Sequence, residues 1–324
     1  MQLTGIHHLT AVTANPAANH AFYTGTLGLR LVKKTVNQDD VSAYHLFYAD
    51  GLASPGTDMT FFDWPGPLER RGTNSIVRTG YRVGSEATLR WWAERFDRLG
   101  VKAAAPVVRD GRLTLDFEDG EGQRLCLVVE SGGAPANPWG RSPVSAEHQI
   151  RGLGPIFLSV PRAEATEHIL RAVLNMKSAR SYRWPAPDGA GAEVRVWEMG
   201  PGGPAAELHL VIEPGLPRAR QGAGAVHHVA LRTPDENAYA AWNERLASLG
   251  LPAILDGLRP RLRQHRPAVE HLLVAHEPQQ LRTRAVPRSV EAGFLGHACS
   301  VSGRARPRKP LRRPYHAEII VMHV

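Results

Sequence analysis

Residues 5–13, GIHHLTAVT, interleave apolar residues with threonine and histidine, which predicts a β-strand. A segment with apolar residues at helical spacing follows at residues 16–26. Three more strand-like runs come next, at residues 29–36, 43–49 and 58–64, and the sequence SPGT marks a turn before the last of them. Together these segments predict one βαβββ unit.

The same order of segments recurs up to about residue 256. The second unit has a strand at 75–83, a helix at 87–99 and strands at 107–108, 113–117 and 125–129. The third has a strand at 156–160, a helix at 163–175 and strands at 194–199 and 207–212, and the fourth has a strand at 225–232 and a helix at 236–249. We therefore predict an α+β fold of tandem βαβββ modules, in which each curved half-sheet must pair with another.

The Gly/Pro-rich segment at residues 131–143 predicts a boundary between two halves of the chain. We expect an N-terminal pair of modules at residues 1–130, a linker at 131–149, a C-terminal pair with an incomplete fourth module at 150–257, and a basic Arg/Pro-rich tail at 258–324.

Charge separates the tail from the rest of the chain. The net charge is +8, and residues 257–324 contain 12 Arg and 1 Lys against 4 Glu and no Asp. The remaining 26 basic and 27 acidic residues nearly cancel. No helix-turn-helix, zinc-finger or base-stacking pattern accompanies the basic tail, so we predict no nucleic-acid partner.

Composition places the chain among globular proteins. Hydrophobic residues make up 43% and charged residues 22% of the 324 residues. No apolar run reaches the roughly 18 residues of a membrane span, and the N-terminus lacks the pattern of a secretory signal. Cys126 and Cys299 cannot build a disulfide framework. We expect a cytoplasmic protein with no membrane partner.

Two His-His pairs occupy the same place in the first and fourth units: His7-His8 and His227-His228 each lie in the opening strand. Because neighbouring side chains of a strand face opposite sides, one imidazole of each pair can enter the interior while the other faces away. If the two units pair, two imidazoles meet in one cleft, where a metal could bind. The alternative is that hydrogen bonds satisfy structural histidines, and the doublets supply no third ligand.

Four phrases resemble ring-cleaving dioxygenases of the vicinal-oxygen-chelate superfamily, in particular the hydroquinone and chlorohydroquinone 1,2-dioxygenase group: GIHHLTAVTANPAANHAFYTGTLGLRLVKKTVNQDD, AYHLFYADG, SPGTDMTFFDWPG and GAVHHVALRTPD. The resemblance covers residues 1–256 and is densest in the first 65. It implies four βαβββ modules and Fe(II), with Mn(II) as the alternative metal, bound by two histidines and one glutamate.

The resemblance also implies residue roles. The two histidine ligands fall on His8 and His228, and His7, Thr10 and His227 then support these ligands or face the substrate. The implied reaction inserts both atoms of O₂ beside a phenolic hydroxyl of a hydroquinone- or catechol-like ring. The expected partners are a small aromatic substrate and O₂, and a homo-oligomer remains open.

The chain departs from the family after residue 257. The family carries its glutamate in a phrase like FEIA that follows a phrase like SIYF, and this chain has neither. One choice of codons for residues 269–273 and 280–283 encodes Ser-Ser-Ile-Tyr and Asn-Phe-Glu-Leu one base later. We therefore favour a frameshift near residues 257–262, which would place the missing glutamate across Arg282 and Thr283.

The third metal ligand consequently stays open between Glu270, Glu277 and none, and with it the activity of this exact chain. Two other functions compete with the dioxygenase. One is a non-catalytic protein of the same fold that binds small molecules, and the other is a glyoxalase-type lyase or isomerase. A metal assay would separate the binding protein from the oxygenase.

Overall fold

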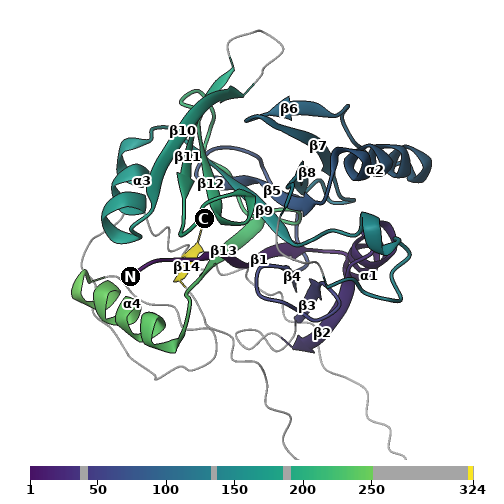
Figure 1. Ribbon diagram of the computed structural model, residues 1–324, viewed down its shortest axis with the longest axis horizontal. Helices are drawn as coiled ribbons and strands as arrows, with labels where there is room; N and C mark the ends of the chain where they lie inside the picture. The colour runs from purple at the N-terminus through teal and green to yellow at the C-terminus, as the bar shows by residue number, and fades with distance from the viewer. Residues whose placement is uncertain (37–42, 133–136, 185–190, 251–319, 324) are drawn as a thin grey trace, which may run out of the picture. The chain divides into compact units, whose positions relative to one another are not determined.

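The strand that opens the chain, β1 (Gly5–Thr13), lies at the centre of the first of two sheets (Figure 1). The computed structural model describes residues 1–36, 43–132, 137–184, 191–250 and 320–323, all within one compact unit. Every segment of the fourth unit between residues 251 and 319 lies outside this described part.

The first sheet joins the first module to the fourth. Its strand order is β14-β13-β1-β4-β3-β2, with β1 antiparallel to β13 and parallel to β4. The other strands of this sheet are β2 (Arg30–Val36), β3 (Tyr44–Ala49), β4 (Asp58–Asp63), β13 (Val226–Arg232) and β14 (Ile320–His323).

The second sheet joins the second module to the third in the same manner. Its order is β10-β11-β12-β9-β5-β8-β7-β6, and β5 runs antiparallel to β9. Its strands are β5 (Ser75–Val83), β6 (Val107–Arg109), β7 (Arg112–Glu118), β8 (Arg124–Val129), β9 (Leu153–Val160), β10 (Lys177–Trp184), β11 (Ala192–Glu198) and β12 (Glu207–Ile212). The predicted α+β fold of βαβββ modules is confirmed.

A helical segment follows the first strand of each module. These segments are α1 (Pro16–His20) with a π-helical turn at Ala21–Thr26, α2 (Glu86–Leu99), α3 (Glu164–His168) with a π-helical turn at Ile169–Val173, and α4 (Glu236–Ser248). Two short 3₁₀ turns lie at Ala146–His148 and Pro204–Ala206. None of the helices in these described segments is long and apolar enough to cross a membrane.

The best-capped helix is α2, which packs against β7 and β8. The Ser85 side chain accepts a hydrogen bond from the Thr88 backbone N–H at its start. Gly100 ends it with φ of 65°, a left-handed conformation that glycine adopts without steric cost.

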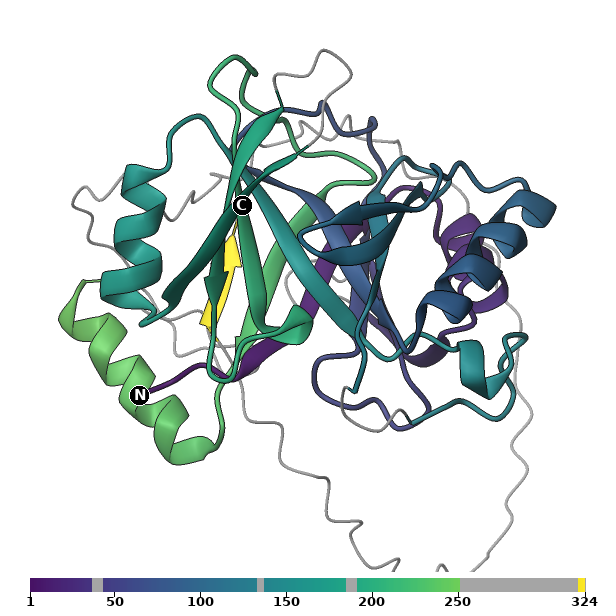
Figure 2. The same ribbon diagram turned by 45° about the horizontal axis from the view of Figure 1, so that its top comes forward.

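The C-terminal segment contributes one strand to the described fold. β14 pairs antiparallel with β13 (Figure 2), opposite His228 and its neighbours along the chain. The rest of the predicted basic tail, together with Glu270 and Glu277, lies outside the described residues. The proposed division into residues 1–130 and 150–257 stays a prediction, and the strand pairing of both sheets crosses it.

Leu9 marks the buried centre of the first sheet. It is fully buried and pairs with Val229 on one side and Met59 on the other. We expect Leu9→Ala to lower the free energy of unfolding by about 2–5 kcal/mol, because it leaves a cavity in this layer. Urea denaturation measures the change. Leu52→Ala, at a side chain 72% exposed, is the control, with a change within about 0.5 kcal/mol. Equal effects of the two substitutions would contradict the placement of Leu9 in the buried centre of the first sheet.

Candidate functional site

His8 and His228 lie on neighbouring strands, 220 residues apart in the sequence. In the pairing of β1 with β13, Thr10 lies opposite His228 and His8 lies opposite Ala230. The two imidazoles meet edge to face, and their Nε2 atoms are 3.4 Å apart. The structure thus brings together the two histidines that the sequence selects, while their role as metal ligands stays a prediction.

The first histidine of each doublet sits in a bulge. The register between β1 and β13 shifts across His7 on one strand and across His227 on the other. Nδ1 of His7 lies 3.0 Å from Nδ1 of His8, and the same atoms of His227 and His228 are 2.8 Å apart. The bulges thus keep both rings of each doublet in contact, while His8 and His228 form the pair that meets across the two strands, as strand parity predicts.

A line of hydroxyls runs across the sheet from the imidazole pair. Thr10 Oγ1 is 2.9 Å from Nε2 of His228 and 2.8 Å from Oγ1 of Thr60 on β4. Thr60 Oγ1 is in turn 2.9 Å from Nε2 of His45 on β3. The predicted site residue Thr10 therefore contacts His228, while its role stays a prediction, and His45 and Thr60 are members of this line that the sequence analysis missed.

Burial keeps the imidazoles of His8 and His45 uncharged near neutral pH. It lowers the pKa of His8 to about 4. It also lowers the pKa of His45 to about 3, with smaller contributions from His8, Lys33 and His227. A neutral imidazole has a nitrogen lone pair, which is the form that binds a metal ion.

The spacing of the two imidazoles fits a shared metal ion. Two metal–nitrogen bonds of about 2.1 Å, meeting at about 90–109°, place their nitrogens about 3.0–3.4 Å apart. The 3.4 Å between the Nε2 atoms of His8 and His228 meets this requirement. No carboxylate of the described residues completes a group of three ligand atoms with them within 4.8 Å. The described residues therefore offer two of the three ligands expected at such a metal site.

Aromatic side chains line the sheet beside the histidines. Phe62 stacks on Trp64 with ring centroids 4.6 Å apart and lies 5.3 Å from the ring of His227. His45 lies between Phe47 and Phe62, at 4.0 and 4.5 Å. Phe47, Phe62 and Trp64 thus form an aromatic wall beside the histidines. A further flat aromatic ring can pack against such a wall.

Asp58 is a partly buried acid on the same face. It is the register partner of His8 in the parallel pairing of β1 with β4, and Thr10 and Thr60, two residues further on, contact each other. Among the described residues, its buried Oδ1 has no hydrogen-bond partner. Burial, aided by Asp50, raises the pKa of Asp58 to about 7. A carboxylic acid with a raised pKa beside such a cluster is a candidate functional group.

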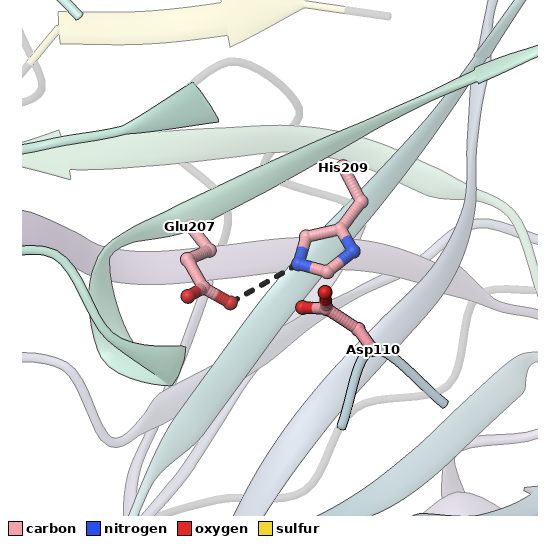
Figure 3. Close-up of side chains that lie close together, drawn as sticks. All are labelled: Asp110, Glu207 and His209. Carbon is pink, nitrogen blue, oxygen red and sulfur yellow. Dashed lines mark hydrogen bonds and ion pairs between the residues drawn. The ribbon is translucent and has the colours of Figure 1, made fainter. Parts of the chain in front are cut away.

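A second cluster with metal-ligand chemistry lies in the other sheet (Figure 3). Asp110, Glu207 and His209 place one potential ligand atom each within 4.8 Å of one another. Glu207 and His209 are alternate residues of β12, whereas Asp110 lies in the Asp-Gly turn between β6 and β7. Its φ of 51° and the 71° of Gly111 are those of a tight hairpin turn.

Arginines already neutralise this cluster. Arg112 donates to both oxygens of Glu207 at 2.6 and 2.7 Å, and Arg180 donates to Glu207 at 2.8 Å and to Asp110. His209 is held by Glu207 at 3.1 Å and by the Tyr182 hydroxyl at 2.9 Å. These partners hold the pKa of Glu207 well below its usual range. The cluster therefore fits an ion-pair network between the second and third modules better than a metal site.

A cavity of about 250 Å³, part of it open to solvent, borders the ion pairs. Arg109, Cys126, Phe157 and Tyr182 are among its lining residues, and His8 and His228 are not. Burial raises the pKa of the Cys126 thiol to about 12, so this thiol is a poor nucleophile. The cavity is thus separate from the imidazole pair.

Comparison with known proteins identifies the family. The model of the Glyoxalase/Bleomycin resistance protein/Dioxygenase superfamily matches residues 5–127. MhqA of Bacillus subtilis, assigned as a ring-cleaving dioxygenase, is 45% identical over 253 residues, which are 77% of this chain and 78% of MhqA. The chain belongs to this superfamily.

Other relatives match this chain in sequence or in fold. Chlorohydroquinone/hydroquinone 1,2-dioxygenase of Sphingobium indicum is 28% identical, covering 84% of this chain and 82% of its own. A crystal structure assigned to a Bacillus subtilis dioxygenase matches with a TM-score of 0.67 and 30% identity over 77% of this chain and 76% of its own. Maize glyoxalase I, at 0.55 and 17% over 78% and 85%, shares the fold alone. The relatives confirm the predicted enzyme class.

The pKa of Asp58 predicts a pH-dependent gain in stability for Asp58→Asn. The folded pKa of about 7 lies above the ordinary 3.8, so ionisation between these values destabilises the folded chain. The substitution removes this cost. We expect its advantage in the free energy of unfolding to grow from pH 4 to pH 7, reaching about 2–4 kcal/mol, and then to level off. Urea denaturation at several pH values measures it. The exposed Asp97→Asn control should show no such trend, and a flat profile for Asp58→Asn would contradict the assignment.

The ion-pair network predicts a large cost for Glu207→Gln. Glu207 is fully buried, and the substitution removes the carboxylate that Arg112 and Arg180 share, which leaves Asp110 as their one common charged partner. We expect the free energy of unfolding to fall by about 3–5 kcal/mol. Glu193→Gln, in a half-exposed pair with Arg195, should change it by about 1 kcal/mol or less. Thermal unfolding compares the variants, and equal small effects would show that the network does not join the modules.

Proposed function

We propose that this protein is a metal-dependent ring-cleaving dioxygenase that acts on a hydroquinone- or catechol-like aromatic and O₂. The observation that carries the proposal is the 3.4 Å separation of the Nε2 atoms of His8 and His228 on paired strands of the first and fourth modules. The name of the Sphingobium indicum relative supports the substrate class. Fe(II) is the proposed metal and Mn(II) the alternative.

His8 and His228 would hold the metal through Nε2, and each is supported by the neighbouring histidine. The contacts of His7 with His8 and of His227 with His228, both through Nδ1, fix the ring orientations, as partners of metal ligands commonly do. When bound, the metal supplies the redox chemistry that joins O₂ to the ring. The third ligand is proposed among Glu270 and Glu277, or is absent from this chain.

The remaining residues would position the substrate. Phe62 and Trp64 provide a stacked aromatic surface beside His227, against which the substrate ring can lie flat. Thr10 Oγ1 lies 2.9 Å from Nε2 of His228, the atom that would bind the metal. Thr10 would therefore stand beside the metal, where it can exchange a hydrogen bond with a substrate hydroxyl. These groups hold the ring and its hydroxyl beside the metal, which lowers the entropic part of the barrier.

The test measures anaerobic Fe(II) binding and then O₂ uptake with chlorohydroquinone or hydroquinone. We expect His8→Ala and His228→Ala each to weaken Fe(II) binding more than 100-fold, because loss of a supporting partner alone costs about 10–100-fold. O₂ uptake should fall with metal content. His168→Ala, on an exposed part of α3, is the matched control and should bind Fe(II) as the unaltered chain does.

A second chain, in which the reading frame is corrected near residues 257–262, distinguishes the possible third metal ligands. O₂ uptake by the restored chain alone would place the third ligand in the restored segment. Uptake by both chains that is lost in Glu270→Gln or Glu277→Gln would assign it to that residue. Aromatic binding without O₂ uptake by either chain would support a binding protein of the same fold. Fe(II) binding that survives both histidine substitutions would overturn the proposed site.

A further inference from the structure

We propose that His45 selects aromatic substrates with a second hydroxyl opposite the one held at the imidazole pair, as in a benzene-1,4-diol. This inference rests on the proposed function, because it needs one end of the substrate to lie at His8 and His228. It adds a specificity-determining residue, on a different strand, to the site described above.

The hydrogen-bonded line across the sheet sets an upper limit on the distance between the imidazole pair and His45. The contacts from His228 through Thr10 and Thr60 to His45 are each 2.8–2.9 Å long, so Nε2 of His45 lies no more than about 9 Å from Nε2 of His228. An aromatic ring anchored at the imidazole pair directs its opposite substituent away from that pair. His45 lies on the same face of the sheet and within reach of such a substituent.

One nitrogen of His45 remains available to a ligand. Nε2 contacts Thr60 at 2.9 Å, and among the described residues none is a hydrogen-bond partner of Nδ1. The His45 side chain is only partly buried, so its second nitrogen is not sealed inside the protein. A neutral imidazole can donate or accept a hydrogen bond, and a phenolic hydroxyl can do the same.

The rings beside His45 hold its plane in place. Phe47 and Phe62 pack on it with ring centroids 4.0 and 4.5 Å away, so the imidazole cannot turn without losing both contacts. Phe62 also contacts His227, which links this wall to the imidazole pair. A site built to bond a hydroxyl discriminates strongly against the analogue that lacks it, because a fixed polar group is then left unpaired.

A purely structural role for His45 is to hold Thr60, and two isosteric substitutions separate the two roles. In His45→Gln the terminal amide can replace Nε2 and keep the contact with Thr60, but nothing replaces Nδ1. In His45→Asn the amide occupies the position of Nδ1, and the contact with Thr60 is lost. If the structural role were the only one, His45→Asn would be the damaging variant.

The experiment titrates the protein with hydroquinone and with phenol, anaerobically and in the presence of Mn(II), by calorimetry, with Mn(II) content measured in parallel. The two ligands differ only in the second hydroxyl. We expect the unaltered chain to bind hydroquinone about tenfold more tightly than phenol, the value of one hydrogen bond. His45→Gln should bring this ratio close to one without changing Mn(II) content, and His45→Asn should keep most of it.

The outcomes distinguish this inference from the proposed function. An unchanged ratio in His45→Gln, a ratio near one in the unaltered chain, or an equal loss in both variants would overturn the role of His45 alone. Failure of the unaltered chain to bind Mn(II) and either phenol would overturn the proposed function and the role of His45 with it.

Discussion

The antiparallel pairing of β1 with β13 is the interaction on which the site depends. These strands begin 221 residues apart, and no local feature of either one brings them together. The pairing joins the first module to the fourth and sets Thr10 opposite His228. A slip of one residue would turn one imidazole to the other face of the sheet. The buried apolar residues that alternate with the site residues, Leu9 and Val229 among them, oppose such a slip.

The two sheets pair their modules in the same way but carry different polar side chains. In the first, the imidazoles of His8 and His228 meet at the central strand pair, next to a partly buried acid and an aromatic wall. In the second, the polar side chains are carboxylates and guanidiniums that neutralise one another. The contrast is electrostatic. A cation gains little near Glu207, whose oxygens Arg112 and Arg180 already occupy, but it can gain two nitrogen ligands at His8 and His228 without displacing a charge.

Much of the fold follows from the sequence because the modules repeat a strong hydrophobic pattern. The expected bounds of β1 and β5 match the structure, and the helix at 87–99 differs from α2 by one residue. β10 was not predicted, since this edge strand is polar and mostly exposed and lacks the apolar alternation of a buried strand. The expected helices at 16–26 and 163–175 are each a short α-helix that continues as a π-helical turn.

The sequence predicts only part of the candidate site, because only some of its residues repeat between modules. The duplicated doublets identify His8 and His228, because the same residues recur at the same place in two modules. His45, Thr60 and Asp58 carry no such repetition, and only the register of β3 and β4 against β1 shows that they share a face. The bulges at His7 and His227 depend on the pairing of distant strands, so strand parity alone does not predict that each of these rings contacts its neighbour in the doublet.

The central claim is that the metal site of this protein lies between His8 and His228. Its most direct test is a crystal structure of the protein grown with Mn(II), with anomalous scattering recorded to locate the ion. The account predicts an anomalous peak about 2 Å from the Nε2 atoms of both histidines, and none at the ion pairs of the second sheet. A peak among Asp110, Glu207 and His209, with none at the histidines, would contradict it.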